Sequence, residues 1–241
     1  PLERLSPLMG EAHALLPSTA SLLFKGDGYI HGSISTIERY FQCPYSYFLQ
    51  SGLKIRKPQI GALDARTTGD IAHSVLENAI LKYGKDYTKI TEEELREIIH
   101  ASFLDLDKMH PHDTTLHSLS EERLFHQLQS ALLFLEDFEK HTSFIPEAVE
   151  RKFEEEIIEG VMLRGTIDRL DTFGNIARVI DYKSSAHTLS KDKVLAGIQL
   201  QLLTYAIIAC RITERDIAGV YYFSLKQETI PTQALKKNRK E

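Results

Sequence analysis

Two stretches decide the fold: Leu163-Arg164-Gly165-Thr166-Ile167-Asp168-Arg169-Leu170-Asp171 and Arg178-Val179-Ile180-Asp181-Tyr182-Lys183. Both alternate as strands do, and Phe173-Gly174-Asn175 between them is typical of a tight turn. A strand has a period of two residues, so Asp181 and Lys183 share one face while Ile180 and Tyr182 point to the other. Because the turn brings the two strands side by side, it places Asp168 next to Asp181.

The polar side chains of these strands predict a metal site. Two carboxylates a few ångströms apart repel each other unless a cation lies between them, so Asp168 and Asp181 are candidate ligands of Mg²⁺ or Mn²⁺. The ammonium of Lys183 can orient a water molecule or neutralise charge on a phosphate. Without Asp168, the pattern of Asp181 and Lys183 is so common that it would favour an exposed ion pair worth roughly 0 to 1 kcal/mol. We expect Asp171 to be a turn residue, and Gly165 to mark a close approach or a bulge.

The surrounding segments predict an α/β domain with a mixed sheet. Alternating residues over 150–159 add a strand before 161–171 and 176–183, and residues 218–223 are predicted to be a buried strand. Expected helices are 35–41, capped by Ser35, then 45–49, 67–83 and an apolar helix over about 193–210. The helix 67–83 has two apolar stripes, Ile71, Val75, Ala79 and Ala72, Leu76, Ile80.

An acidic segment separates the first part of this pattern from the strands. Thr91 with Glu94, and Ser118 with Glu121, are capping boxes that predict helices near 92–107 and 120–141. Residues 92–159 hold 18 Asp and Glu against 6 Lys and Arg, whereas the other 173 residues hold 16 against 23. The total charge of −5 therefore hides a basic remainder, and a nucleic-acid partner is not excluded.

Composition excludes several other classes of protein. With 241 residues, 42% hydrophobic and 26% charged, the chain is typical of a globular protein. It has no apolar run near the ~18 residues of a membrane span and no secretory leader, so we expect a cytoplasmic location and no membrane partner. A phosphate-binding loop of the Gly-x4-Gly-Lys-Ser/Thr type is absent from the sequence, so ATP hydrolysis is not expected here.

The chain divides into three expected parts. Residues 1–32 mix Pro, Gly and short apolar patches and are predicted to be a linker or boundary segment. Residues 33–230 form the predicted domain, with a helical elaboration at about 84–145. Residues 231–241 form a basic tail, and both ends are expected to be boundaries set on a longer chain.

Two helices carry polar pairs at a spacing of four residues. His73 and Glu77 share one helix face, as do Gln201 and Tyr205. A single helical histidine is more often a structural residue than a ligand, and Gln and Tyr often border a core. Only their order relative to the carboxylates gives these pairs a functional meaning.

The order of these polar residues along the chain resembles the order of motifs in a known family. Four motifs in sequence order are similar to those of the RecB-type branch of the PD-(D/E)xK nuclease superfamily. They are Gly69-x3-His73-x2-Leu76-Glu77, Gly165-x-Ile167-Asp168-Arg169, Asp181-Tyr182-Lys183 and Gln201-x3-Tyr205. Two further stretches extend the likeness to the C-terminal nuclease domains of the AddB/RexB family. They are Ile34-Ser35-Thr36-Ile37-Glu38-Arg39-Tyr40-Phe41-Gln42-Cys43-Pro44-Tyr45 and Gly219-Val220-Tyr221-Tyr222-Phe223. The resemblance covers about residues 30–225 and implies a restriction-endonuclease-like core, in which helices flank a mixed central sheet and a helical segment is inserted.

The resemblance also implies a function. It implies a Mg²⁺-dependent deoxyribonuclease, expected to be an exonuclease, in an ATP-dependent helicase-nuclease that resects double-strand breaks with an AddA/RexA-like partner subunit. Asp168 and Asp181 would bind the metal, with His73 and the backbone carbonyl of Tyr182 as further ligands, and Lys183 would orient the water. Supporting or DNA-contacting roles fall to Glu77, Gln201 and Tyr205.

One implied feature departs from the pattern. In the AddB family the cysteine before the proline is the first ligand of a [4Fe-4S] cluster, and Cys43 matches it. The other three ligands lie in a C-terminal Cys-rich group that this sequence lacks, and such a cluster usually needs four thiolates. We therefore expect a cluster only in the full-length protein and none on this sequence, where Cys43 would be a buried small hydrophobe.

Three alternatives stay open. The chain could be a catalytically inactive nuclease fold that binds DNA or a partner, although the carboxylates and the lysine are all retained. It could also be a stand-alone exonuclease of the same superfamily, such as a Cas4-like exonuclease. A competing metal site would use His110, His112, Asp113 and His117, whose spacing fits neither a helix nor a strand.

Overall fold

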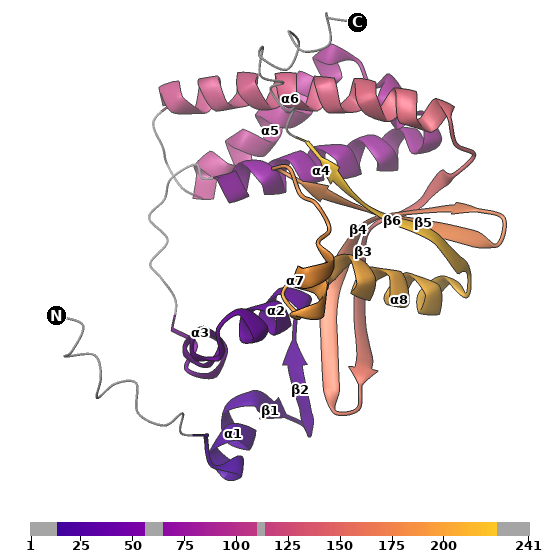
Figure 1. Ribbon diagram of the computed structural model, residues 1–241. Coiled ribbons are helices and arrows are strands. Elements are labelled where there is room, and N and C mark those ends of the chain that lie inside the picture. The colour runs from indigo at the N-terminus through magenta and orange to yellow at the C-terminus, as the bar shows by residue number, and fades with distance from the viewer. Residues whose placement is uncertain (1–13, 56–64, 110–113, 226–241) are drawn as a thin grey trace, which may run out of the picture.

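The computed structural model describes residues 14–55, 65–109 and 114–225. Its centre is a six-stranded mixed sheet in the order β1-β2-β4-β5-β6, with β3 paired to β4 (Figure 1). Strands β2 and β4, and β5 and β6, are parallel, and the other pairs are antiparallel. The strands are β1 (Lys25–Gly26), β2 (Tyr29–Gly32), β3 (Ile145–Ile158), β4 (Val161–Phe173), β5 (Ile176–Lys183) and β6 (Asp216–Ser224).

Helices cover the sheet from two sides (Figure 1). One layer contains α4 (Ala65–Tyr83), the 3₁₀ helix η3 (Gly84–Lys89), α5 (Glu92–Met109) and α6 (Thr114–Lys140). The other side has α2 (Ile34–Gln42), α7 (Lys191–Leu195) and α8 (Gln201–Thr213), and the N-terminal part adds α1 (Pro17–Phe24), α3 (Pro44–Tyr47) and the π-helix η2 (Phe48–Gly52). None of the described helices is long and apolar enough to cross a membrane.

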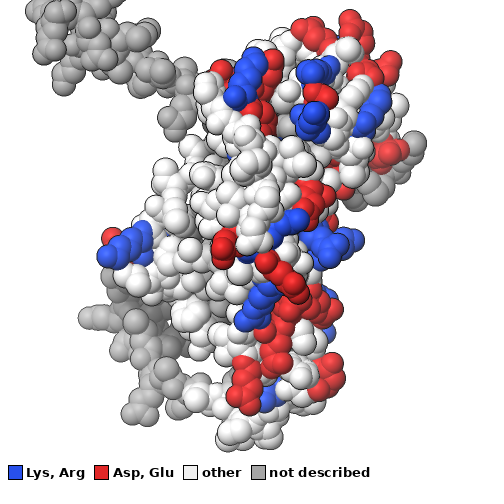
Figure 2. Space-filling model, turned by 90° about the vertical axis from the view of Figure 1, so that its right-hand side faces the viewer, with Lys and Arg blue, Asp and Glu red and all other residues white. Residues whose placement is uncertain are grey.

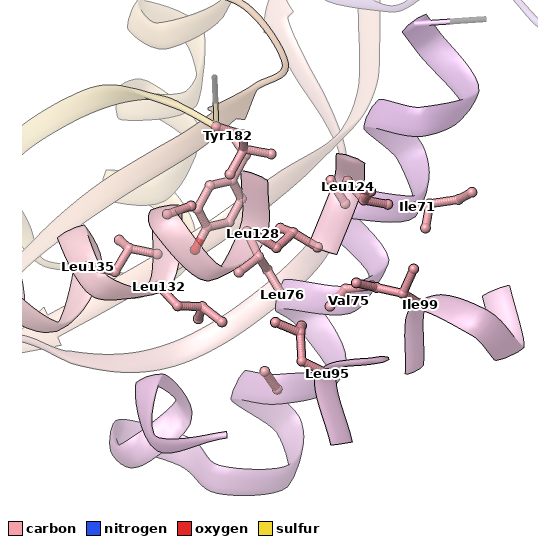
Figure 3. Close-up of a cluster of buried hydrophobic side chains, with 14 of the residues drawn as sticks. Ile71, Val75, Leu76, Leu95, Ile99, Leu124, Leu128, Leu132, Leu135 and Tyr182 are labelled. Carbon is pink, nitrogen blue, oxygen red and sulfur yellow. The ribbon is translucent and has the colours of Figure 1, made fainter. Parts of the chain in front are cut away.

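The central strand β5 separates two hydrophobic cores. Ile180 and Tyr182 pack into the core that α4, α5 and α6 form, whereas Ala177 and Val179 pack into the core beneath α8. This alternation confirms the period of two expected for the strand. Figure 3 shows the ring of Tyr182 among the leucines of α6, so the residue between Asp181 and Lys183 is anchored in the helical layer.

The predicted stripes of α4 are confirmed. The side chains of both stripes are less than a tenth exposed and belong to the core of the helical layer (Figure 3). They are Ile71, Val75 and Ala79 in one stripe, and Ala72, Leu76 and Ile80 in the other. Burial of these aliphatic side chains, at roughly 25 cal/mol per Å² of apolar surface, orients α4 against the sheet. The polar face of α4, which carries His73 and Glu77, is thereby fixed in direction.

Several boundaries differ from the sequence predictions. The helix α2 is capped by Ser33, whose Oγ accepts from the backbone N–H of Thr36 at 3.3 Å, and not by Ser35. The helix α6 begins at Thr114, so Ser118 lies inside it and the predicted start at 120 is wrong. The capping box of Thr91 and Glu94 is confirmed, since each backbone N–H donates to the side chain of the other.

The predicted helix over 193–210 is broken into α7 and α8. Gly197 lies in the break with a φ of +75°, a left-handed conformation that a helix interior does not contain. The apolar sequence continues through the break, where Ile198 and Leu200 are half-buried, which is why periodicity alone did not reveal it.

Part of the segment predicted to be a linker is structured. Residues 14–32 contain α1, β1 and β2, and Ile30, His31 and Gly32 of β2 pair in parallel with Val161, Met162 and Leu163. The sheet therefore extends into this segment, while the domain limits themselves stay a prediction.

The charges of the chain do not form one basic surface on the face shown in Figure 2. Lys and Arg side chains alternate there with Asp and Glu side chains, over both the helices and the β3–β4 hairpin. Part of the predicted basic excess belongs to Lys236, Lys237, Arg239 and Lys240, outside the described residues.

Candidate active site

Asp168 lies where α4, β4 and β5 meet. Its Oδ2 accepts a hydrogen bond of 2.8 Å from the backbone N–H of Tyr182, and Nδ1 of His73 is 3.4 Å from the same atom. The strand pairing of β4 and β5 continues up to Arg169 and Ile180, so this bond extends the contact between the strands beyond their last regular pair. The structure thus brings His73 and Asp168 together, as predicted.

A glutamate that the sequence analysis missed completes this group. Glu150 lies on β3 between Val149 and Arg151, which pair with Arg169 and Ile167, so it stands opposite Asp168. Its φ of +46° is left-handed, which is uncommon for a residue other than glycine. Ligand atoms of His73, Glu150 and Asp168 all lie within 4.8 Å of one another.

Asp181 and Lys183 form the second half of the site. Nζ of Lys183 lies 2.6 Å from Oδ2 of Asp181, which confirms that the two side chains share one face of β5. Nζ also donates to Oε1 of Gln201 at 2.8 Å, and Nε2 of Gln201 donates to Oδ1 of Asp181 at 2.9 Å and to the hydroxyl of Tyr205 at 3.1 Å. The amide of Gln201 therefore joins the carboxylate, the ammonium and the phenol.

The pKa values of the carboxyl groups in both halves of the site are raised. Burial, followed by the charge of Asp181, raises the pKa of Asp168 to about 7. Burial raises the pKa of Glu150 to about 7, and the charges of Asp168 and Glu77 add to this. Burial also raises the pKa of Asp181, against the opposing charge of Lys183. A site that disfavours three carboxylates is one that a cation would stabilise.

The residues fit a divalent metal ion. Oδ2 of Asp181 is buried, and its partner is the ammonium of Lys183, in an ion pair of 2.6 Å. Buried carboxylate oxygens are costly unless enough partners surround them, and a cation at the site would supply a further one. Carboxylate oxygens with one imidazole nitrogen suit Mg²⁺ or Mn²⁺.

The side chains of this group differ in their exposure to solvent. The side chain of Asp181 is 1% exposed and that of Asp168 11%, whereas those of Lys183 and His73 are 22% and 26% exposed. The carboxylates of Asp168 and Asp181 are therefore more deeply buried than the ammonium of Lys183 and the imidazole of His73.

The predictions for three other residues, Glu77, Tyr182 and Cys43, have different outcomes. Glu77 lies close enough for its charge to raise the pKa of Glu150, but its hydrogen bond within the site stays a prediction. The carbonyl of Tyr182 as a ligand also stays a prediction. The expected burial of Cys43 is wrong: it is exposed, and its Sγ accepts from the backbone N–H of Ser46 at 3.4 Å, so it caps α3.

The alternative metal site lies outside the described part of the chain. His110, His112 and Asp113 are not among the described residues, and the side chain of His117 is not described either. The expectation that an iron-sulfur cluster is bound only in the full-length protein stays a prediction, because the position of Cys43 does not test it.

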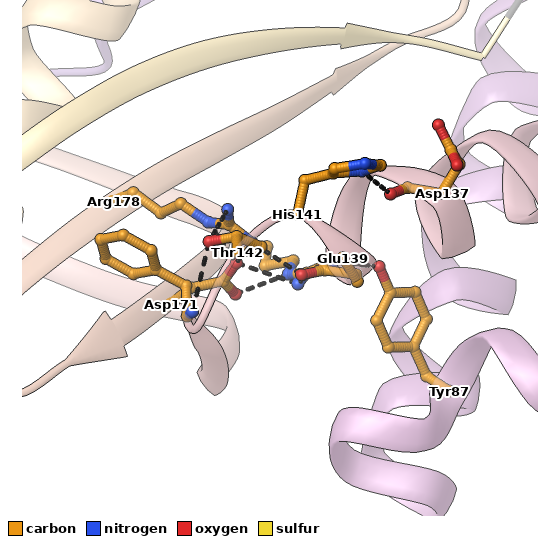
Figure 4. Close-up of polar contacts among 9 residues, drawn as sticks. Tyr87, Asp137, Glu139, His141, Thr142, Asp171 and Arg178 are labelled. Atoms are coloured by element: carbon orange, nitrogen blue, oxygen red, sulfur yellow. Dashed lines mark hydrogen bonds and ion pairs between the residues drawn. The ribbon is translucent and has the colours of Figure 1, made fainter.

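A buried charge network lies behind the site, on β4 and β5. The guanidinium of Arg169 donates to Asp171 at 2.6 Å, to the hydroxyl of Tyr87 at 2.6 Å and to Glu139 at 2.6 Å. Arg178 binds the same two carboxylates, at 2.8 Å for Asp171 and 3.0 Å for Glu139 (Figure 4). Asp171 is fully buried in this network, so its prediction as a turn residue is wrong.

This network joins the helical layer to the strands β4 and β5. Glu139 belongs to the last turn of α6 and Tyr87 to η3, while Arg169 directly follows Asp168 in β4. Gly165 shows the predicted close approach, because the ring of Phe153 occupies the space where a Cβ would lie, 2.7 Å from its nearest atom.

Comparison with known families gives one match over most of the chain. Residues 31–241 match a family model described as the PD-(D/E)XK nuclease superfamily. The match includes every residue of the site described above.

Similar curated proteins are each described as a subunit of an ATP-dependent helicase/deoxyribonuclease. The relative from Listeria welshimeri is 31% identical in an alignment 249 residues long that covers 90% of this chain and 21% of the relative. A relative from Thermoanaerobacter is 32% identical in an alignment 223 residues long that covers 81% of this chain and 19% of the relative. One from Bacillus cereus is 30% identical in an alignment 228 residues long that covers 81% of this chain and 20% of the relative. The chain thus spans about a fifth of the length of these relatives.

Proposed function

The chain belongs to the PD-(D/E)XK nuclease superfamily, and we propose that it is a metal-dependent deoxyribonuclease domain that hydrolyses phosphodiester bonds. Its mixed sheet flanked by helices is the restriction-endonuclease-like fold that the sequence predicts. The observation that carries the proposal is the group of His73, Glu150 and Asp168, whose ligand atoms lie within 4.8 Å of one another, with Asp181 near enough for its charge to raise the pKa of Asp168 and Lys183 paired to Asp181.

Each residue has a role in this proposal. Asp168, Asp181 and His73 would hold Mg²⁺ or Mn²⁺, and Glu150 adds a carboxylate that the sequence did not indicate. When bound, the ion would supply positive charge against the scissile phosphate and lower the pKa of a water molecule. The backbone carbonyl of Tyr182 is proposed as a further ligand.

Lys183 acts on the water and on the phosphate. Its Nζ is held by Asp181 and Gln201, so its direction is fixed before a substrate binds. An ammonium in this position can orient an attacking water molecule and neutralise charge that develops on the phosphate oxygens. No covalent intermediate between enzyme and substrate is needed.

Gln201, Tyr205 and Glu77 surround this group. Gln201 holds the side chains of Lys183 and Asp181 in position relative to each other, and the hydroxyl of Tyr205 accepts a hydrogen bond from the amide of Gln201. The charge of Glu77 raises the pKa of Glu150, so the potential at Glu150 is negative and would favour a cation there. Contact of Gln201 or Tyr205 with a DNA phosphate is part of the proposal.

The relatives suggest the setting of this activity. They are described as subunits of an ATP-dependent helicase/deoxyribonuclease, and this chain matches a fifth of their length. We propose that the chain is the nuclease part of such a subunit, acts in the cytoplasm as an exonuclease during double-strand break resection, and works with an AddA/RexA-like partner. A stand-alone exonuclease of the Cas4-like kind is the less well supported alternative.

DNA cleavage by the intact protein tests the proposal. Wild-type protein should degrade linear double-stranded DNA in Mg²⁺, leave it intact in EDTA, and spare covalently closed circles if it is an exonuclease. Asp181→Ala should abolish this cleavage, and Asp216→Ala, an exposed aspartate at the start of β6, is the matched control.

The inactive-module alternative makes a different prediction in the same experiment. It predicts DNA or partner binding without cleavage and no heat of Mn²⁺ binding in calorimetry. Undiminished cleavage by Asp181→Ala would reject the assignment of the site.

A further inference from the structure

The helix α8 receives its N-terminal cap from a distant part of the chain. It begins at Gln201 after Leu200, and neither residue supplies a side-chain cap. Oε1 of Glu38 accepts hydrogen bonds from the backbone N–H groups of Leu200, at 2.6 Å, and Gln201, at 3.1 Å. The first N–H groups of a helix lack partners within the helix, and a carboxylate there also interacts favourably with the helix dipole.

A second contact holds Glu38 in place. Phe41 lies one turn further along α2, and its ring packs on Gly197 in the break between α7 and α8. A Cβ at Gly197 would lie 2.6 Å from the ring, and the residue has a φ of +75°. The helix α2 thus contacts the α7–α8 break through two residues of one face.

The capped residue is the one that holds Lys183. The side chain of Gln201 accepts from Nζ of Lys183 at 2.8 Å and donates to Asp181 at 2.9 Å. Only two hydrogen-bonded steps therefore separate the carboxylate of Glu38 from the ammonium at the site, although Glu38 is 163 residues away from Gln201 in the sequence.

We infer that Glu38 is a positioning residue for the reaction: it fixes the first turn of α8, and through Gln201 it holds Lys183 in the direction that the chemistry needs. The inference rests on the proposed nuclease function. The metal-site side chains His73, Glu150, Asp168 and Asp181 belong to α4, β3, β4 and β5, so loss of Glu38 should act on catalysis more than on metal binding.

Three substitutions separate the hydrogen bonds from the charge. Glu38→Ala removes the oxygen that accepts both hydrogen bonds and should lower kcat about ten- to a hundredfold, the range expected for a small misplacement of a catalytic group, with KM for DNA changed less than about twofold. Glu38→Gln keeps an oxygen at the same reach and should restore most of kcat. Glu38→Asp keeps the charge but is shorter by a methylene group, and it should not.

A double-mutant cycle tests whether Glu38 acts through Gln201. If it does, Glu38→Ala with Gln201→Ala should be no slower than Gln201→Ala alone, whereas independent effects would multiply. Glu97→Ala, an exposed glutamate on α5, is the matched control and should leave kcat unchanged.

Calorimetry and unfolding complete the test. The Mn²⁺ affinity of Glu38→Ala should stay within about threefold of wild type, since the proposed ligands of the ion lie on α4, β3, β4 and β5 and not on α2 or α8. Thermal unfolding shows whether each variant is folded at the assay temperature; if Glu38→Ala is not, the contrast between Glu38→Gln and Glu38→Asp decides.

The possible failures are distinguishable. Wild-type protein without metal-dependent cleavage would reject the proposed function. Active wild type with an unchanged kcat in Glu38→Ala, or with effects of Glu38 and Gln201 that multiply, would reject the positioning role alone.

Discussion

The backbone N–H of Tyr182 donates a hydrogen bond of 2.8 Å to Oδ2 of Asp168, so the strand with Asp181 and Lys183 is joined to its neighbour by a carboxylate that is proposed to bind the metal. The ring of the same Tyr182 is anchored in the core of the helical layer. The position of the two carboxylates therefore depends on packing as well as on strand pairing, and the predictions below separate these contributions.

Asp168→Asn should stabilise the metal-free protein while abolishing cleavage. Asp168 has a raised pKa, near 7, because burial and the charge of Asp181 disfavour its ionised form. An amide keeps an oxygen that can accept from Tyr182 but removes the repulsion, so we expect a gain of about 1 kcal/mol at pH 8, as active-site substitutions often give. Chemical denaturation in EDTA measures it, and a loss of stability would contradict the electrostatic account.

That gain should depend on pH. An ordinary aspartate titrates near 4 in the unfolded chain, whereas Asp168 and Glu150 have folded-state pKa values of about 7. Between these values the folded protein binds more protons than the unfolded chain, so wild type loses stability as the pH rises. The advantage of Asp168→Asn in EDTA should thus be largest at pH 8 and shrink towards pH 5. A constant difference over this range would show that the carboxyl group is not involved.

Glu150→Gln should weaken metal binding. Its carboxylate lies within 4.8 Å of the ligand atoms of His73 and Asp168, and an amide oxygen has no charge to offer a cation. We expect Mn²⁺ affinity to fall at least about tenfold, the lower end of the loss seen for residues around metal sites. Glu154→Gln, an exposed residue on the same strand, is the control. Equal affinities of the two variants in calorimetry would place the metal away from Glu150.

Asp171→Ala should destabilise the fold strongly. It leaves Arg169 and Arg178 buried with only Glu139 as a carboxylate partner, and breaking a buried ion network by removing one partner typically costs about 3 to 5 kcal/mol. The exposed pair of Arg96 and Glu122 is a matched contrast, and Glu122→Ala should have a much smaller effect because solvent screens this pair. Similar losses for both variants in urea unfolding would contradict the importance of burial.

The sequence predicted the parts of the site that depend on local periodicity. Asp181 and Lys183 share a strand face because of the period of two, and Gln201 and Tyr205 share a helix face because four residues make about one turn. The tight turn after β4 then sufficed to bring Asp168 to Asp181. These relationships involve residues close in the sequence or joined by one short turn.

The missed features depend on backbone irregularity or on distant contacts. Glu150 faces Asp168 only because of the register of β3 with β4 and a left-handed φ, and the break at Gly197 is hidden by a continuous apolar pattern. Asp171 resembles a turn residue until Arg178 and Glu139 are placed around it. No local pattern indicates that Glu38 caps a helix more than 160 residues later.

The single-turnover cleavage rate of Lys183→Ala tests the central claim most directly. The variant retains every proposed metal ligand, so it should bind Mn²⁺ as wild type does and yet cleave linear DNA at least about a hundredfold more slowly, the loss typical of removing one group that stabilises a transition state. Cleavage at the wild-type rate, with metal binding unchanged, would contradict the role of Asp168, Asp181 and Lys183 as one catalytic unit.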